Sequence, residues 1–120
     1  KVIEEVEKET QNNSGVYLNL AVSYGGKWDI INAVKKIIKE GIDPEKITEE
    51  FFDDYLSTAG LPDPDLIIRA GGEMRLSNFV LWQSAYAELY FSEKLWPDFQ
   101  EEDLDKALKE FDDRQRRFGK

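Results

Sequence analysis

The sequence predicts an α/β fold with a mostly parallel sheet flanked by helices. Three short apolar segments have the composition of strands, at residues 16–23, 65–70 and 88–92, and they alternate with stretches of helical periodicity. The 120 residues suffice for one domain, which we expect to span residues 1–120. Two glycine pairs directly follow predicted strands. Ligands of parallel sheets bind at the carboxyl ends of the strands, so these pairs indicate a candidate site.

The N-terminal part is expected to contain a helix, a strand and a second helix. The first twelve residues predict the first helix. "VYLNLAVS", residues 16–23, is rich in apolar and β-prone residues and predicts the strand. Asp29 is the expected N-cap of the second helix and Gly41 its end, with an apolar face formed by Ile30, Val34, Ile37 and Ile38.

Helices and loops also separate the other two predicted strands. Thr48 is expected to cap a short helix through Leu56, which the glycine- and proline-rich loop "STAGLPDPD" follows. Residues 79–87, "FVLWQSAYA", have aromatic residues three and four apart and predict a helix. Asp98 and Glu101 have the spacing of a capping box for the last helix, whose buried stripe comprises Leu104, Ala107, Leu108 and Phe111.

Composition excludes several classes of function. Lys and Arg number 16 and Asp and Glu 25, so the net charge of −9 repels nucleic acid and no nucleic-acid partner is expected. The chain has no cysteine and no histidine, which excludes disulfides, thiolate or imidazole metal sites and the commonest general base. It shows neither a signal-peptide pattern nor an apolar run of membrane-spanning length, so a cytoplasmic protein is expected.

The stretch "RAGGEMRLSNF", residues 69–79, is rich in groups that bind anions. Arg69 and Arg75 offer planar forks that match phosphate oxygens, and Ser77 adds a hydroxyl. Gly71 and Gly72 allow backbone N–H groups to approach an anion closely. The richness of this set suits a diphosphate better than a carboxylate.

Two acidic residues are candidates for holding a cation beside that anion. Glu73 lies within the stretch and Glu88 begins the third predicted strand; either could bind Mg²⁺, which usually bridges carboxylates and substrate phosphates. A second interpretation stays open. Paired glycines after a strand commonly form a tight turn, and Arg69, four residues before Glu73, has the spacing of a surface ion pair.

Long stretches of the chain resemble one known family. Residues 62–99, "PDPDLIIRAGGEMRLSNFVLWQSAYAELYFSEKLWPDF", resemble the C-terminal signature of the cis-prenyltransferases, the family of undecaprenyl diphosphate synthase and related isoprenyl transferases. "LNLAVSYGGKWDI", residues 18–30, resembles the family's preceding strand, turn and helix, and "DDRQRRFGK", residues 112–120, its C-terminal tail. The resemblance covers essentially the whole chain and implies the cis-prenyltransferase fold.

The resemblance implies an activity and assigns residues to it. Such enzymes condense isopentenyl diphosphate onto an allylic prenyl diphosphate to make a cis-polyprenyl diphosphate, with Mg²⁺ as cofactor. It implies that Arg69, Arg75 and Glu73 are catalytic and that Glu88 is the metal ligand. The residues that it implies for substrate binding are Arg69, Arg75, Ser77, Gly71, Gly72, Arg117 and Gly119.

The resemblance also implies partners. Family members are homodimers or heteromers, so a homodimer is expected, in which Arg117-Phe118-Gly119 of the tail reaches toward the other subunit's active site. The lipid product implies a peripheral contact with a membrane.

The chain departs from the family in two respects. Ala70 stands where the family usually has threonine, and Met74 where many bacterial members have a histidine near the metal. The family's Asp-Gly-Asn-Gly-Arg-Trp loop, which holds the allylic diphosphate, does not occur in these residues. We therefore expect the chain to be the C-terminal part of the enzyme, to work with the N-terminal half, and to be inactive alone.

An alternative class is a non-catalytic partner subunit of a heteromeric cis-prenyltransferase. Such subunits characteristically lack the Arg-x-Ser donors, whereas Arg75 and Ser77 are both present, so the catalytic interpretation is favoured. A nucleotide-binding module is disfavoured, because neither glycine pair extends to G-x-G-x-x-G or to a phosphate-binding loop with its lysine.

Overall fold

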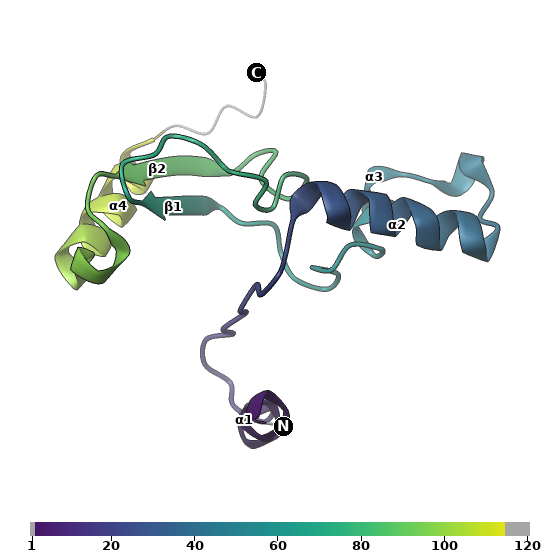
Figure 1. Cartoon of the computed structure of the whole chain (residues 1–120), viewed down its shortest axis with the longest axis horizontal. Coiled ribbons are helices and arrows are strands. Elements are labelled where there is room, and N and C mark those ends of the chain that lie inside the picture. Colours follow the sequence, from purple (N-terminus) through teal and green to yellow (C-terminus); the bar gives the residue numbers. More distant parts are fainter. Residues whose placement is uncertain (1, 115–120) are drawn as a thin grey trace.

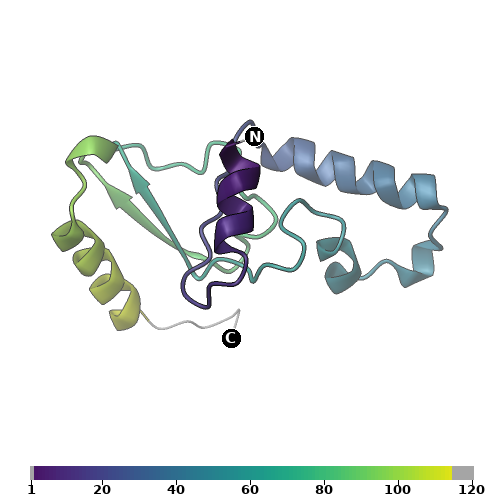
Figure 2. The same ribbon diagram turned by 90° about the horizontal axis from the view of Figure 1, so that it is seen from below.

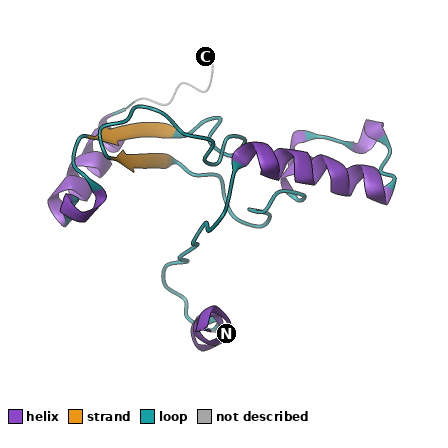
Figure 3. Cartoon of the chain, viewed as in Figure 1, coloured by secondary structure: helices purple, strands orange, loops and turns teal. Residues whose placement is uncertain are grey.

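The computed structural model describes residues 2–114, which form an open arrangement of helices and one small sheet. Figures 1 and 3 show α2 and α3 at one end, the two strands and α4 at the other, and α1 apart from both. The radius of gyration is 17.2 Å, against about 14 Å for a compact domain of this length. The elements are α1 (Val2–Thr10), α2 (Gly26–Glu40), the 3₁₀ turn η1 (Pro44–Lys46), α3 (Glu49–Asp53), β1 (Leu66–Ala70), β2 (Glu88–Ser92), the 3₁₀ turn η2 (Trp96–Asp98) and α4 (Glu101–Asp113).

β1 and β2 confirm two of the three predicted strands and the α/β class. They pair in parallel, with Leu66 opposite Glu88 and Ala70 opposite Ser92. The turned view of Figure 2 shows α4 on the side of the strands away from α2. The carboxyl ends of both strands therefore lie at one edge of the sheet, and the residues after Ala70 begin there.

The predicted strand at residues 16–23 is wrong, because these residues have no regular secondary structure. Val16 is 98% exposed, and the side chains of Tyr17, Leu18, Leu20 and Val22 are exposed as well. A strand is held by hydrogen bonds to a neighbouring strand. Within residues 2–114 the sheet contains only β1 and β2, so this β-prone segment has no neighbour there.

The predicted helix at residues 79–87 is also wrong, because the segment is a series of turns. The N–H of Ser84 donates to the carbonyl of Val80 over 2.9 Å, but Ala87 donates to Ser84, three residues back, over 3.1 Å. Val80 has a positive φ of 38°, which a helix does not allow. The indole N–H of Trp82 instead contacts α3, where it donates to the Asp53 carboxylate over 2.6 Å.

The remaining predicted helices exist, with shifted ends. α2 begins at Gly26, so Asp29 lies in its first turn and is not its cap, whereas Gly41 ends it as expected, with φ of 65°. Thr48 caps α3 as predicted, but α3 ends at Asp53 and not at Leu56. The N-cap of α4 is Gln100, whose N–H donates to the Asp103 carboxylate over 2.9 Å, so the predicted capping pair of Asp98 and Glu101 is replaced by Gln100 and Asp103.

The buried apolar core lies where α2 meets α3. Ala33, Ile37, Phe52 and Leu56 form the buried cluster, and Trp82 packs against it with its ring centroid 4.7 Å from that of Phe52. On α4 the predicted stripe is buried only at Ala107, since Leu104 and Leu108 are 41% and 44% exposed. Among the described helices, none combines the length and apolarity needed to cross a membrane.

Asp29 is the largest fully buried side chain of the described residues, with 1% exposure. One carboxylate oxygen accepts from the amide of Ser57 over 2.9 Å and from its hydroxyl, and the other from the hydroxyl of Tyr24 over 3.1 Å. The amide of Gln83 lies 3.4 Å from that second oxygen. Burial alone raises the pKa of Asp29, but the hydrogen bonds from Ser57, Tyr24 and Gln83 outweigh it, and the net pKa is lowered.

We predict that Asp29→Asn lowers the free energy of unfolding by about 1–3 kcal/mol, because the new amide presents a donor where donors already point. Because folding lowers the pKa of Asp29, the difference in free energy of unfolding between wild type and Asp29→Asn should be complete above about pH 4 and shrink at lower pH. Denaturant unfolding at several pH values measures both effects. The exposed Asp105→Asn is the control, and equal losses for the two variants would contradict the role of Asp29.

Candidate functional site

The loop that follows β1, residues 71–78, is called the donor loop because it carries most of the predicted anion-binding groups. It opens with Gly71 and Gly72, whose φ angles of 101° and 75° suit glycine. The N–H of Gly71 donates to the carbonyl of Lys94 over 2.7 Å, and that of Gly72 to Ser92 over 2.9 Å. Both amides are therefore engaged with the chain after β2, so the pair shapes the turn and its amides are already used within the chain.

Arg69, the penultimate residue of β1, is hydrogen-bonded to this loop. Its Nη1 donates to the hydroxyl of Ser77 over 2.8 Å and to the backbone carbonyl of Arg75. Arg69 thus contacts the Ser77 side chain and the backbone of Arg75, and the assignment of the three residues to an anion site stays a prediction. Nη1 of Arg69 therefore fixes the shape of the loop and orients the Ser77 hydroxyl.

Arg75 lies at the surface of the donor loop and is paired with an acid of the same loop. Its Nη1 is 2.7 Å from Glu73 Oε2, and the two side chains are 61% and 51% exposed. An ion pair this exposed is screened by water and contributes little to stability. A diphosphate, with more charge and more acceptor oxygens, can replace Glu73 as the partner of the Arg75 fork.

The donor loop is joined to the first turn of α2 through Asn78. The carbonyl of Asn78 accepts from the N–H of Gly26 over 2.7 Å, and its side-chain oxygen accepts from the N–H of Lys27 over 2.9 Å. Asn78 therefore caps a helix that begins 52 positions earlier in the chain. Sequence reasoning missed this role, although asparagine is a good capping residue.

The backbone is strained where the donor loop meets this helix. Ser77, Asn78 and Val80 have φ angles of 49°, 66° and 38°, a region that residues other than glycine seldom adopt. Such strain persists only where surrounding contacts fix it, and it concentrates at functional sites. A Cβ at Gly26 would lie 2.8 Å from Leu81 Cγ and 3.0 Å from its backbone nitrogen, so the absence of a side chain at Gly26 permits the close approach of α2 to Leu81.

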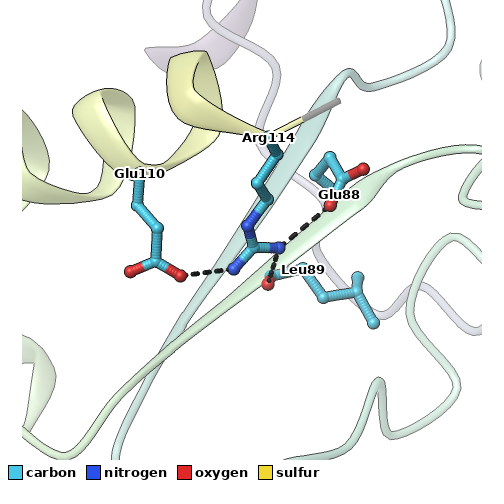
Figure 4. A network of polar contacts seen from close by, with 4 residues as sticks. All are labelled: Glu88, Leu89, Glu110 and Arg114. Atoms are coloured by element: carbon cyan, nitrogen blue, oxygen red, sulfur yellow. Dashed lines mark hydrogen bonds and ion pairs between the residues drawn. The ribbon is translucent and has the colours of Figure 1, made fainter. Parts of the chain in front are cut away.

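Glu88, the predicted metal ligand, lies at the opposite end of the sheet from the donor loop. It pairs with Leu66, the first residue of β1, whereas the loop follows Ala70, the last. Its Oε2 accepts from Nη1 of Arg114 over 2.9 Å, and its side chain is 27% exposed (Figure 4). The structure therefore separates Glu88 from Glu73, Arg75 and Ser77 of the same chain.

The residues present fit a magnesium ion only if other groups, such as substrate phosphates, supply some of its ligands. Residues 2–114 contain no group of three or more metal-binding side chains. Glu88 supplies a single partly buried carboxylate, which matches Mg²⁺ that is held by one or two carboxylates and by substrate phosphates. The predicted substrate residues Arg117 and Gly119 lie outside the described residues.

Two hollows lie away from the donor loop. A pocket of about 170 Å³ is bordered by Asp53, Asp63 and Gln83 and contains none of the predicted site residues. A more open hollow of about 480 Å³ is lined by Asp65, Phe111, Asp112 and Arg114. The exposed side chains of Arg75 and Glu73 place the predicted anion site in a surface loop.

Known proteins resemble the chain along nearly its whole length. The model of a family described as "Putative undecaprenyl diphosphate synthase" matches residues 1–119. An isoprenyl transferase of Fusobacterium nucleatum is 54% identical over 99% of this chain and 50% of its own length. A ditrans,polycis-undecaprenyl-diphosphate synthase ((2E,6E)-farnesyl-diphosphate specific) of Buchnera aphidicola is 53% identical over 98% of this chain and 49% of its own.

A solved structure shares the fold. The crystal structure of lavandulyl diphosphate synthase from Lavandula x intermedia, in complex with dimethylallyl diphosphate, superposes with a TM-score of 0.91 at 46% identity. The match covers 98% of this chain and 52% of that one. The chain thus spans about half the length of the curated relatives it matches.

We predict that Gly26→Ala lowers the free energy of unfolding by about 1–3 kcal/mol, because the added methyl group clashes with the backbone of Leu81. Gly15→Ala is the matched control, since nothing lies within 4 Å of a Cβ at that position. Chemical denaturation of the full-length protein measures both variants. Equal stability of Gly26→Ala and wild type would show that α2 does not rest on the 77–81 segment as described.

Proposed function

The chain belongs to the prenyltransferase family of undecaprenyl diphosphate synthases, and we propose that it is the part of a cis-prenyltransferase that binds isopentenyl diphosphate. The observation that supports the proposal is the donor loop, in which Arg69 donates to the Ser77 hydroxyl and to the backbone carbonyl of Arg75. The complete enzyme condenses isopentenyl diphosphate onto an allylic prenyl diphosphate. The rest of the same domain supplies the site for the allylic substrate.

Each donor has a distinct role toward the diphosphate. Arg75 exchanges its exposed partner Glu73 for two diphosphate oxygens, and the rigid fork makes this contact bidentate. Ser77 donates its hydroxyl to a third oxygen while its own oxygen accepts from Arg69. Arg69 therefore acts mainly by holding the Ser77 hydroxyl and the backbone of Arg75, and Gly71 and Gly72 act by setting the turn.

Glu88 and a magnesium ion complete the proposed chemistry. When bound, Mg²⁺ neutralises the charge that develops on the departing pyrophosphate. Glu88 holds the ion together with substrate phosphates. Four residues along a strand correspond to about 13 Å, and by the observed register this separates Glu88 from the donor loop of its own chain.

That separation supports the proposal of a homodimer in which one subunit completes the site of another. Glu88 is bonded to Arg114, the residue directly before the tail that carries Arg117 and Gly119. In this proposal, Glu88 and the start of the tail lie next to each other in one subunit, and both contribute to the site at the donor loop of the other subunit. We further propose a cytoplasmic enzyme that contacts the membrane peripherally through its lipid product.

We predict that Arg75→Ala raises the KM for isopentenyl diphosphate of the full-length enzyme by about 10–100-fold, the equivalent of losing charged hydrogen bonds of about 1.5–3 kcal/mol. Arg75→Lys should restore little, because an ammonium cannot make the bidentate contact. Steady-state kinetics with the allylic substrate held saturating measures both.

The control for this experiment is Lys35→Ala, which removes an exposed cation of α2. Its KM for isopentenyl diphosphate should equal that of wild type. If Arg75→Ala behaves like Lys35→Ala, the donor loop does not bind this substrate.

A further inference from the structure

Arg114 joins the end of α4 to the start of β2 through three acceptors (Figure 4). Nη1 donates to Glu88 Oε2 and to the backbone carbonyl of Leu89, both over 2.9 Å. Nη2 donates to Oε1 of Glu110, one turn earlier on α4. One guanidinium therefore links a helix, a strand backbone and the carboxylate of the proposed metal ligand.

Two of these three bonds fix Arg114 without any help from Glu88. The carbonyl of Leu89 belongs to the backbone of β2, and Glu110 lies on the same helix as Arg114. The Arg114 side chain is 32% exposed, so the bonds are only partly screened by water. The guanidinium thus keeps two acceptors besides Glu88, whereas Glu88 accepts its bond from Arg114.

The bond to Glu88 uses one of the two carboxylate oxygens. A carboxylate free to rotate must lose that freedom when it takes up a cation, whereas one already held by a neighbouring donor does not. Carboxylates that ligate metals are generally held in this way by a second layer of hydrogen bonds, and loss of such a partner typically weakens metal affinity by about 10–100-fold.

Two simpler roles for Arg114 lead to different expectations. As a helix-end cation it would stabilise α4 and leave metal affinity unchanged. As a competitor it would occupy Glu88 in place of the metal, so its removal would strengthen metal binding. The hollow of about 480 Å³ that Arg114 lines with Asp65, Phe111 and Asp112 leaves this side of the network accessible from solvent.

We propose that Arg114 is a positioning residue that orients the Glu88 carboxylate for the cation, acting through Glu88 alone. The inference rests on the proposed function, in which Glu88 binds the metal.

The test uses the full-length enzyme and measures Mn²⁺ affinity by electron paramagnetic resonance, with isopentenyl diphosphate present and no allylic substrate, so that no turnover occurs. Arg114→Gln should raise the dissociation constant for Mn²⁺ by about 10-fold or more. Arg114→Lys should fall between wild type and Arg114→Gln, since lysine keeps the charge but cannot reach three acceptors at once. Lys109→Gln, which removes an exposed cation of the same helix, should bind Mn²⁺ as wild type does.

A double-mutant cycle shows whether Arg114 acts through Glu88. Glu88→Gln alone should weaken Mn²⁺ binding, and adding Arg114→Gln to it should weaken binding no further. Thermal unfolding of each variant reports stability separately. If Arg114→Gln does not fold, the comparison of Arg114→Lys with Lys109→Gln decides the question.

The outcomes separate this inference from the function on which it rests. If Glu88→Gln binds Mn²⁺ like wild type, the proposed role of Glu88 fails, and the role of Arg114 fails with it. If Glu88→Gln weakens binding but Arg114→Gln leaves it unchanged or strengthens it, the role of Arg114 alone is overturned.

Discussion

The buried carboxylate of Asp29 is the interaction on which the arrangement around the donor loop depends. Asp29 lies in the first turn of α2. It accepts hydrogen bonds from Ser57, in the chain after α3, and from Gln83, in the series of turns at residues 79–87. A buried charge is tolerated only when hydrogen bonds replace its lost hydration, and here those bonds come from three separate segments. Once Asp29 fixes α2 against residues 79–87, the N–H groups of Gly26 and Lys27 lie within hydrogen-bonding distance of Asn78. The shape of the donor loop at its far end follows from that contact.

The proposed function requires an acidic chain to hold an anion. The net charge of −9 opposes binding at long range. At short range the geometry of a few donors decides, because charge-assisted hydrogen bonds act only over contact distances. One nitrogen of the Arg69 guanidinium already bonds the loop itself, so the proposed function assigns phosphate binding mainly to Arg75 and Ser77. Glu73 holds the Arg75 fork in an exposed ion pair within the loop.

The sequence predicted those features that depend on neighbouring residues and missed those that depend on distant ones. β1, β2, the glycine that ends α2 and the cap of α3 follow from local composition, and the structure contains all four. Asp29 looked like a helix cap because aspartate is a common cap, and only partners 28 and 54 positions away reveal it as a buried acceptor. Residues 16–23 have the composition of a strand, yet a strand also requires a neighbour. The proximity of Arg69 to Ser77 was predictable, since both flank one tight turn, whereas the link from Arg114 to Glu88 was not.

The capping of α2 by Asn78 has a consequence for the order in which the protein folds. Isolated helices of about 12–15 residues are only marginally stable in water, and α2 has 15 residues. Its first turn gains its hydrogen-bond acceptors only after a loop of about fifty residues has closed, which is an entropically unfavourable step. Helix initiation and loop closure must therefore occur together, and the two segments behave as one cooperative unit. In amide hydrogen exchange, Gly26 and Lys27 then report on the integrity of a loop that lies far from them in the chain.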